Sequence, residues 1–313
     1  MNFLCSLDQL TLADLETVGD KAAYLGELMR AGFAAPRGFC LTADAYRAVV
    51  ANPLNDKIAA RLAATEIDDP VELEAATDDI RAWIEAVPVP AALTAEIENA
   101  LPALGALSFA VRASRVIEDV PNPAASGLPQ AYLGVVGAAA VWRSVKLIWA
   151  LPWNSRAIYF RQRKKIPLAH VTMAVVLQPM LNPAAAGVLF TANPLTGAAD
   201  EIHIDATFGL GEAIIAARWK PDHFVVAKPT HAIRDRNIST KNVMEGVAAD
   251  GTLQTLAVTP AQQAAAVLGD SQVVALAALG EKIETHFRAP QDIEWGWLGA
   301  QPWIFQTRPL RKK

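Results

Sequence analysis

The chain has 313 residues, of which 52% are hydrophobic and 19% are charged. This length suits two domains of about 150 residues each, and the apolar content supports a buried core and excludes disorder over most of the chain. The 28 Lys and Arg residues are outnumbered by 32 Asp and Glu residues, which gives a net charge of -4. A nucleic acid is therefore not expected as the main partner.

The cysteines and the apolar segments exclude further classes of protein. Cys5 and Cys40 have no CxxC or metal-ligand spacing, so neither a disulfide framework nor a structural zinc site is expected. The most apolar segment, residues 131–153, is interrupted by two basic residues and a proline, which favours a buried helix over a membrane span. The first residues lack the basic and apolar regions of a signal peptide. We therefore expect a soluble cytoplasmic protein that is not associated with a membrane.

The first 104 residues are expected to form helices around one short strand. After a break at residues 19–21, apolar residues recur at helical spacing over residues 25–29. An extended run at residues 38–41 precedes Thr42, a typical N-cap residue for the next helix. Residues 51–104 are rich in alanine and charged side chains and have a helical period, which several prolines interrupt.

From residue 107 the pattern favours strands mixed with helices. A strand over residues 108–112 is followed by a loop rich in proline and glycine. Further elements are then expected in this order: helices at 138–150 and 154–165, strands at 171–180, 187–191, 202–205 and 222–227, and a helix that starts with the capping-box sequence Thr259-Pro260-Ala261-Gln262. The basic run at 161–165 is expected to be a solvated helix end.

The chain ends in an expected β-hairpin, with strands at 292–297 and 302–308. Side chains alternate along a strand, so Asp292 and Glu294 share one face, and Gln306 and Arg308 share a face of the second strand. The turn places Glu294 opposite Gln306. Carboxylate and amide oxygens suit Mg²⁺, and a nearby guanidinium suits a polyphosphate. Taken alone, the pattern is more typical of a surface hairpin with one solvated polar face.

Two cations outside the hairpin also have positions that suit phosphate. Lys21 lies at a helix start next to glycine, and Arg112 ends a strand before the loop rich in glycine and proline. An ordinary solvated charge is the commoner alternative for either residue alone. The turn at residues 209–211 is only weak evidence for an anion site, and neither a Walker motif nor a GxGxxG motif is present. The five histidines lack a nucleophile or metal-ligand spacing and are expected to be structural or exposed.

Short motifs follow one another along nearly the whole chain. They are Gly19 to Leu28, Ala35 to Phe39, Ala110 to Ser114 with Glu118-Asp119, Val175 to Met180, Gly187 to Thr191, Gly209 to Glu212, Pro290 to Trp295, and Gln306 to Pro309. In this order they resemble GGKGANLGEM, VPPGF, AVRSSATAED and the later motifs of one family. That family is the ATP-binding domain of phosphoenolpyruvate synthase, pyruvate phosphate dikinase and rifampicin phosphotransferase.

The resemblance implies an α+β, ATP-grasp-like fold in which the nucleotide lies in a cleft between two subdomains. We place the subdomains at residues 1–190, with the lysine and the phosphate loop, and at residues 191–313, with the metal-binding hairpin. The implied ligands are ATP and Mg²⁺, with Mn²⁺ as a substitute. The implied site residues are Lys21, Arg112 and Arg308 as catalytic phosphate-binding cations, Gln178 near the adenine, Gly127 and Glu212 as further nucleotide contacts, and Glu294 and Gln306 as metal ligands.

The resemblance also implies an activity. In the family, ATP gives its β-phosphoryl group to a histidine and leaves AMP and phosphate. No histidine of this sequence has the expected GGxTSHA context. We therefore expect the ATP-binding subunit of a split phosphotransferase, whose separate partner subunit carries the histidine and the acceptor site. Phenylphosphate synthase and 4-methylphenyl phosphate synthase have this organisation, so the expected acceptor is phenol or p-cresol.

Several alternatives remain open. The chain could be an excised domain of a longer synthase, and the acceptor could be pyruvate or an antibiotic. The phosphate loop also departs from the family pattern, because SSAT is Ala113-Ser114-Arg115-Val116 here and GQQDTY is replaced over residues 127–132. These lost hydroxyl and acidic groups indicate altered γ-phosphate handling. They also fit a third alternative, a non-catalytic nucleotide-sensing subunit.

Overall fold

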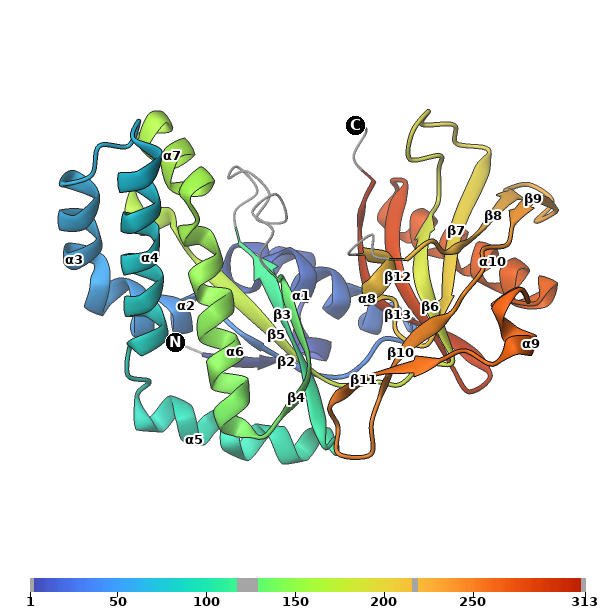
Figure 1. Cartoon of the computed structure of the whole chain (residues 1–313), viewed down its shortest axis with the longest axis horizontal. Coiled ribbons are helices and arrows are strands. Elements are labelled where there is room, and N and C mark those ends of the chain that lie inside the picture. The colour runs from blue at the N-terminus through green and yellow to red at the C-terminus, as the bar shows by residue number, and fades with distance from the viewer. Residues whose placement is uncertain (1–2, 117–128, 216–218, 311–313) are drawn as a thin grey trace. The chain divides into compact units, whose positions relative to one another are not determined.

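The computed structural model describes residues 3–116, 129–215 and 219–310 (Figure 1). The chain divides into two compact units. Unit 1 comprises Met1–Glu27 and Arg37–Met180, and unit 2 comprises Leu28–Pro36 and Leu181–Lys313. The division after Met180 differs from the boundary expected after residue 190. The reason is that β6 (Ala185–Phe190) pairs with strands of unit 2 on both of its sides.

Unit 1 is built on a five-stranded antiparallel sheet in the order β1-β2-β5-β3-β4. The strands are β1 (Leu4–Ser6), β2 (Phe39–Leu41), β3 (Ser108–Arg115), β4 (Ala131–Val136) and β5 (Met173–Pro179). The expected strands near residues 38–41, 108–112 and 171–180 are confirmed as β2, β3 and β5. Cys5 and Cys40 face each other across β1 and β2 as free thiols.

Strand β4 corrects the expectation of one buried helix over residues 131–153. The backbone turns at Gly137, whose φ of 82° is left-handed, and the helix begins only at Ala138. An apolar run by itself does not distinguish a buried strand from a buried helix, and the glycine was the available signal for the break.

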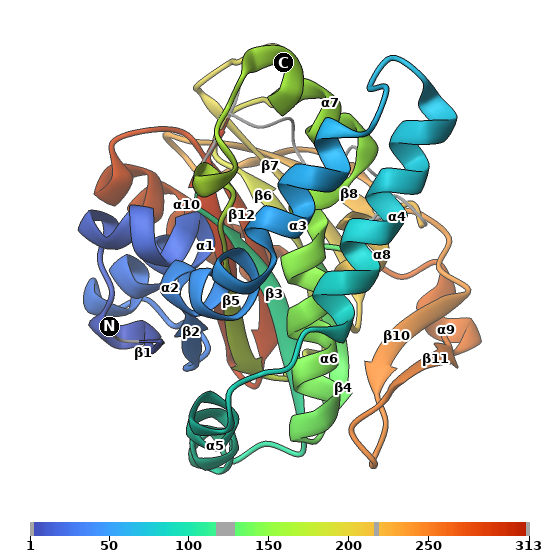
Figure 2. The same ribbon diagram turned by 90° about the vertical axis from the view of Figure 1, so that its left-hand side faces the viewer.

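The helices of unit 1 cover both faces of its sheet. They are α1 (Leu15–Arg30, which ends in unit 2), α2 (Ala43–Tyr46), α3 (Asn52–Ala63), α4 (Pro70–Ala86), α5 (Ala91–Ala100), α6 (Ala138–Ala150) and α7 (Ser155–Lys164). Short 3₁₀ turns occur at Leu7–Gln9, Leu12–Asp14, Leu101–Leu104, Leu151–Trp153 and Leu168–His170, with a π-helical stretch at Arg47–Ala51. Helix α6 packs on β3, β4 and β5 and lies beside α4 (Figure 2). Its apolar stripe closes a core that contains Trp149 and Trp153, both buried.

The expectation that residues 161–165 form a solvated helix end is wrong for Arg161 in α7, which is buried. Its side chain is only 3% exposed, and its guanidinium donates to the carbonyl oxygen of Pro152 at 2.5 Å and lies 5.0 Å from the ring centre of Trp153. Burial lowers the pKa of Arg161 to about 10. The neighbouring residues Gln162 to Lys165 are exposed, as expected.

Replacing Arg161 by alanine is therefore expected to lower the free energy of unfolding by about 2 kcal/mol. The substitution leaves the Pro152 carbonyl without its donor and removes a side chain packed on Trp153. Urea denaturation would measure the loss. Arg163→Ala in the same helix is the control. Arg163 contacts Tyr159 and Asp68 at the surface, so its substitution should not measurably change the free energy of unfolding. Equal losses for the two variants would contradict the prediction.

Unit 2 is built on a six-stranded antiparallel sheet in the order β13-β12-β6-β7-β8-β9. Besides β6, the strands are β7 (Glu201–Phe208), β8 (Asp222–Ala227), β9 (Ile233–Asn237), β12 (Gln291–Leu298) and β13 (Gln301–Pro309). Strands β10 (Val243–Val247) and β11 (Leu253–Ala257) form a separate two-stranded sheet. The helices are α8 (Glu212–Ile215), α9 (Pro260–Gln263) and α10 (Asp270–Phe287).

Helix α10 covers one face of the six-stranded sheet (Figure 1). Alternate residues of the strands, such as Ile204, Phe224 and Ile293, are buried against the apolar side of this helix. The residues between them therefore lie on the opposite face, which carries the polar side chains described below.

The expected helix start at Thr259 is confirmed, but the capping box does not form. The Thr259 hydroxyl donates to the side chain of Gln262 at 2.7 Å instead of capping the backbone. The helix ends at Gln263, and the long helix of this region begins at Asp270.

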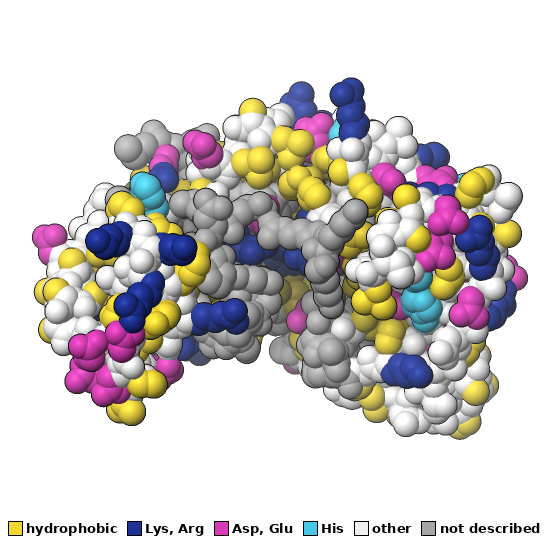
Figure 3. Space-filling model, turned by 90° about the horizontal axis from the view of Figure 1, so that it is seen from above, with side chains coloured by type: hydrophobic (Ala, Val, Ile, Leu, Met, Phe, Trp, Pro, Cys, Tyr) yellow, Lys and Arg dark blue, Asp and Glu magenta, His cyan; other side chains and the backbone are white. Residues whose placement is uncertain are grey.

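No helix within the described residues is long and apolar enough to cross a membrane. On the face of the molecule in Figure 3, basic side chains (dark blue) and acidic side chains (magenta) are interspersed with apolar ones. A mixed surface of this kind agrees with the small net charge of -4.

Candidate functional site

Lys21 follows a sharp break in α1, and Gly19 causes it. Gly19 has a φ of 75° inside the helical segment, and a Cβ atom at this position would lie 2.5 Å from the carbonyl carbon of Ser114. Only glycine allows both the left-handed backbone and this close approach to β3. The break therefore places the start of the second part of α1, with Lys21, against the end of β3.

Ser114 joins the two segments. Its hydroxyl donates to the carbonyl of Val18 at 2.6 Å and accepts a hydrogen bond from the amide of Ala22 at 3.1 Å. Ser114 is fully buried, so this bridge is shielded from water. Sequence reasoning did not single out Ser114 for this role, although it ends the motif that contains Arg112.

Arg112 and Gln178 lie on the same face of the unit 1 sheet as Ser114. Gln178 of β5 is opposite Ala110 of β3, and side chains at alternate positions of a strand share a face. This is the face on which α1 lies, since Ser114 contacts α1 from it. The structure thus brings three residues singled out from the sequence, Lys21, Arg112 and Gln178, to one side of one sheet.

Gly127, Glu118 and Asp119 lie outside the described residues.

The terminal hairpin in unit 2 has the expected geometry. Glu294 is the cross-strand partner of Gln306, and Asp292 is the partner of Arg308. Gly299, with a φ of 61°, lies in the turn between the two strands. A register shift follows Glu294, so the pairing beyond it is displaced by a bulge. The expectation that these four polar side chains meet on one face is confirmed.

Asp292 holds Arg308. The Nε and Nη2 atoms of Arg308 lie 2.8 and 2.7 Å from the Oδ2 atom of Asp292. The aspartate side chain is 14% exposed and the arginine side chain 47% exposed. The carboxylate is thus largely shielded, while the guanidinium remains accessible to a ligand.

Glu294 and Gln306 can supply one carboxylate oxygen and one amide oxygen to a metal ion. Among the described residues, no cluster of three or more His, Cys, Asp or Glu side chains is arranged to hold one. Mg²⁺ is nevertheless commonly held by one or two carboxylates together with substrate phosphates and water. The donor set of the hairpin therefore fits Mg²⁺ bound together with a polyphosphate.

Glu212 follows a turn that is held in place by β10. Gly209 has a φ of 69°, and a Cβ atom there would lie 2.0 Å from the carbonyl oxygen of Glu245. The amide of Leu210 donates to the same oxygen at 2.9 Å. Helix α8 starts at Glu212 and contacts β6 and β7. The turn is thus a backbone junction, and its four-residue helix gives no support to a separate anion site.

Three titratable side chains, those of Glu294, Asp205 and His223, form a row across the polar face of the same sheet. Glu294 is opposite Val188 of β6, Val188 is opposite Asp205 of β7, and Asp205 is opposite His223 of β8. Direct cross-strand partners point to the same side of a sheet. The polar face of the hairpin thus continues across β6 to β7 and β8.

His223 of this row bonds to His203, and each of the two rings also bonds to a carboxylate. His203 Nδ1 lies 3.3 Å from His223 Nε2, while the outer ring nitrogens lie 3.0 Å from Glu201 and 2.7 Å from Asp205. All these hydrogen bonds form when the two rings together carry one extra proton. Hydrogen bonds from Asn193 and His203 lower the pKa of Glu201. The expectation of structural histidines holds for this pair, but the pairing across strands was not foreseen.

This row predicts a pH dependence of stability. The hydrogen bond to Asp205 raises the pKa of His223 above its ordinary value of 6.5. The stabilisation is therefore fully present below about pH 6.5 and is lost as the pH rises through the raised pKa. The free energy of unfolding of the wild type should exceed that of His223→Gln by more at about pH 6 than at about pH 8.5. The difference should be about 1 kcal/mol or less, because the ring is partly exposed and solvent screens the pair.

Urea denaturation at several pH values would measure this difference. Asp205→Asn should remove the same pH dependence. His170→Gln, which changes an exposed histidine of unit 1, should leave it intact. A His223→Gln variant with the wild-type pH dependence would contradict the assignment.

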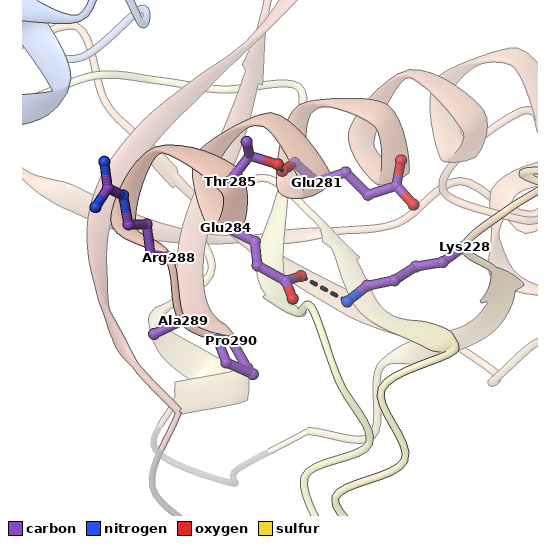
Figure 4. Close-up of a pocket in the computed structure, with 7 residues that line it drawn as sticks. All are labelled: Lys228, Glu281, Glu284, Thr285, Arg288, Ala289 and Pro290. Atoms are coloured by element: carbon purple, nitrogen blue, oxygen red, sulfur yellow. Dashed lines mark hydrogen bonds and ion pairs between the residues drawn. The ribbon is translucent and has the colours of Figure 1, made fainter.

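A cavity of about 420 Å³ lies elsewhere in unit 2. Figure 4 shows its lining at the C-terminal end of α10, where Lys228 reaches Glu284 at 2.6 Å. The other lining residues are Glu281, Thr285, Arg288, Ala289 and Pro290. Pro290 begins one of the quoted motifs, but no lining residue is among the candidate site residues, and the two basic groups are balanced by two acidic ones. The cavity is therefore not part of the candidate site.

Comparison with known proteins identifies the family. Residues 15–313 match the family model described as "Pyruvate phosphate dikinase, AMP/ATP-binding domain". The chain therefore belongs to this family. The α+β fold is the one expected for an ATP-grasp-like member of it.

Relatives of this AMP/ATP-binding domain include longer phosphotransferases. The phosphoenolpyruvate synthase of Pyrococcus furiosus is 33% identical over 98% of the chain, which covers 44% of that protein. The rifampicin phosphotransferases of Streptomyces sviceus and Bacillus subtilis are 37% and 32% identical over 98% and 99% of the chain, which covers 36% of each. The chain thus spans less than half the length of these relatives. Across that length it is a dikinase-type ATP-binding domain.

Proposed function

We propose that this chain binds Mg²⁺-ATP and supports its cleavage to AMP and phosphate, with transfer of the β-phosphoryl group to a histidine. The observation that carries the proposal is the family match over residues 15–313, because it spans every candidate residue. The grouping of the candidates supports the proposal. One sheet face brings together Lys21, Arg112 and Gln178, and a face of the other sheet brings together Glu294, Gln306 and Arg308.

The roles of the residues follow from their chemistry. Lys21, Arg112 and Arg308 would bind the phosphates, because guanidinium and ammonium groups offset the charge that develops on the transferred phosphoryl group. Gln178 would lie near the adenine, and its burial to 2% exposure favours a fixed orientation. Gly127 and Glu212 would make the further nucleotide contacts.

Glu294 and Gln306 would hold Mg²⁺, or Mn²⁺ in its place, and the ion would neutralise phosphate charge and orient the phosphates. Asp292 keeps Arg308 at the same face of the hairpin. The protein thus contributes positioning and charge neutralisation, the two requirements of phosphoryl transfer.

The histidine that receives the phosphoryl group is proposed to lie outside these 313 residues. His203 and His223 bond to each other and to carboxylates, and His231 lies 2.8 Å from Glu281. The ring of His286 packs edge-on against Phe33 and Phe287. His170 is exposed, but it lies in a 3₁₀ turn without a neighbouring motif for this chemistry. A separate partner subunit that also carries the acceptor site is the proposed source.

The proposed acceptor is a phenol, either phenol itself or p-cresol. The net reaction would then convert ATP, water and the phenol into AMP, phosphate and the phosphorylated phenol. The names of the relatives favour a second candidate, in which pyruvate or an antibiotic is the acceptor. Both candidates share the same chemistry on this chain and differ only in the acceptor site of the partner.

A non-catalytic nucleotide sensor is a further candidate of another class. The altered phosphate loop favours it, because Ala113, Arg115 and Val116 replace small or hydroxyl-bearing residues of the family pattern. A sensor would bind ATP without releasing AMP.

Product analysis separates these functions. The chain would be incubated with ATP, Mg²⁺ and the candidate partner, and AMP, phosphate and labelled histidine would be measured. The proposed function requires AMP and a phosphohistidine on the partner. ATP binding without AMP would favour the sensor, and ADP as the sole nucleotide product would indicate a simple kinase. Adding phenol, p-cresol, pyruvate or the antibiotic rifampicin would then identify the acceptor that removes the label.

A further inference from the structure

Asp20 connects the lysine segment to the end of β3. Its Oδ1 atom accepts hydrogen bonds from the amide of Lys21 at 2.7 Å and from the amide of Arg115 at 3.0 Å. Its Oδ2 atom pairs with the guanidinium of Arg115 at 3.3 Å. One carboxylate thus binds three donors from two segments that are 95 residues apart in the sequence.

This contact is shielded from water. The side chains of Asp20 and Arg115 are 22% and 16% exposed. Most exposed ion pairs contribute little, but shielded hydrogen bonds to a charged group are stronger and better oriented. The contact also lies beyond the last residue pair of β3 with β4, Arg112 with Ala131. Asp20 therefore accepts the hydrogen bond from the Arg115 amide that a neighbouring strand would otherwise accept.

The position of Lys21 depends on this contact and on Ser114. The amide of Lys21 is bound by Asp20 and the amide of Ala22 by Ser114, so the first turn after the break is tied to β3 twice. Ser114 and Arg112 share one face of β3. These two contacts therefore fix the backbone position of Lys21 relative to Arg112.

We propose that Asp20 and Arg115 are positioning residues that hold Lys21 for phosphate binding. The proposal rests on the proposed function, in which Lys21 binds ATP. Both residues stand where the chain departs from the quoted patterns, with Asp20 in GGK and Arg115 in SSAT. Because they contact each other, the two departures act as one unit. The basic group of Arg115 is thus engaged by Asp20 and is not a further phosphate ligand beside Lys21, Arg112 and Arg308.

Binding of Mg²⁺-ATP to the full chain, measured by calorimetry, tests the proposal. Asp20→Ala and Arg115→Ala should each weaken binding about 10-fold, and the double variant about 10-fold rather than about 100-fold. Asp20→Asn keeps an acceptor for both amides and should lose only about 3-fold. In a Lys21→Ala background, Asp20→Ala should have no further effect on binding, since Asp20 acts through Lys21.

Arg61→Ala is the matched control. Arg61 pairs with Asp79 at 2.7 Å in the same unit, between α3 and α4 (Figure 1), and its loss should leave ATP binding unchanged. Additive losses from Asp20→Ala and Arg115→Ala would overturn the proposal. So would a further loss of binding from Asp20→Ala in the Lys21→Ala background, which would indicate a general structural role. A wild-type chain that binds no Mg²⁺-ATP would instead overturn the proposed function, and this inference with it.

Discussion

Replacing Glu294 by alanine is expected to lower AMP formation at least about 100-fold while the fold stays intact. Glu294 supplies the carboxylate of the hairpin's donor set, opposite the amide of Gln306. Asp292 cannot easily replace it, because Asp292 is engaged by Arg308. The loss should also appear as weaker Mg²⁺-dependent binding of ATP. Product analysis with the candidate partner and calorimetry without it would measure the two effects.

Arg308→Ala should have a comparable effect, because it removes the proposed phosphate-binding cation from the same face. Asp250→Ala serves as the control for both variants. Asp250 is an exposed carboxylate in the turn between β10 and β11, where it accepts hydrogen bonds from Thr252. Thermal unfolding should show a similar midpoint for all three variants. Unchanged turnover in Glu294→Ala would contradict the assignment of the metal site.

Replacing Gly19 by alanine is expected to destabilise unit 1 by about 3 kcal/mol. The new Cβ atom would lie 2.5 Å from the backbone of Ser114, which cannot move without disturbing β3. The φ of 75° adds a steric cost for any residue other than glycine. Because Lys21 follows two residues later, ATP binding should also weaken in the fraction that remains folded.

Gly32→Ala is a matched control for Gly19→Ala. Gly32 also has a positive φ, of 82°, but a Cβ atom there would have no heavy atom within 4 Å. Its substitution should cost about 1 kcal/mol, from the backbone alone. Urea denaturation would compare the two variants. Equal losses would show that the contact with Ser114 contributes nothing.

Much of the fold follows from local sequence signals. Helix α6 and strand β8 have the expected bounds, Ala138–Ala150 and Asp222–Ala227. Gly137 and Pro152 flank the first segment, and Pro221 and Pro229 flank the second. The terminal hairpin also follows from alternation and a glycine turn, and with it the facing of Glu294 and Gln306. Local rules thus predicted the polar face of β12 and β13 before any tertiary information.

Other features depend on contacts that local patterns do not encode. Strand β4 was expected as part of a helix because an apolar run by itself does not distinguish a strand from a helix. Strands β10 and β11 were missed because they pair with each other and are partly exposed, so β11 shows no alternation of apolar residues. The contact of Asp20 with Arg115 and the pairing of His203 with His223 join distant segments. Only the register of the sheets and the break at Gly19 bring these groups together.

The outer strand β9 has a consequence for self-association. It ends the six-stranded sheet, and its residues from Arg234 to Asn237 are exposed. Arg234 pairs with Asp200, and Arg236 pairs with Asp270. A foreign strand that added to this edge would have to strip water from these charges and disturb their pairs. Such edges disfavour fibre growth, so the β9 edge of the six-stranded sheet is protected against the addition of further chains.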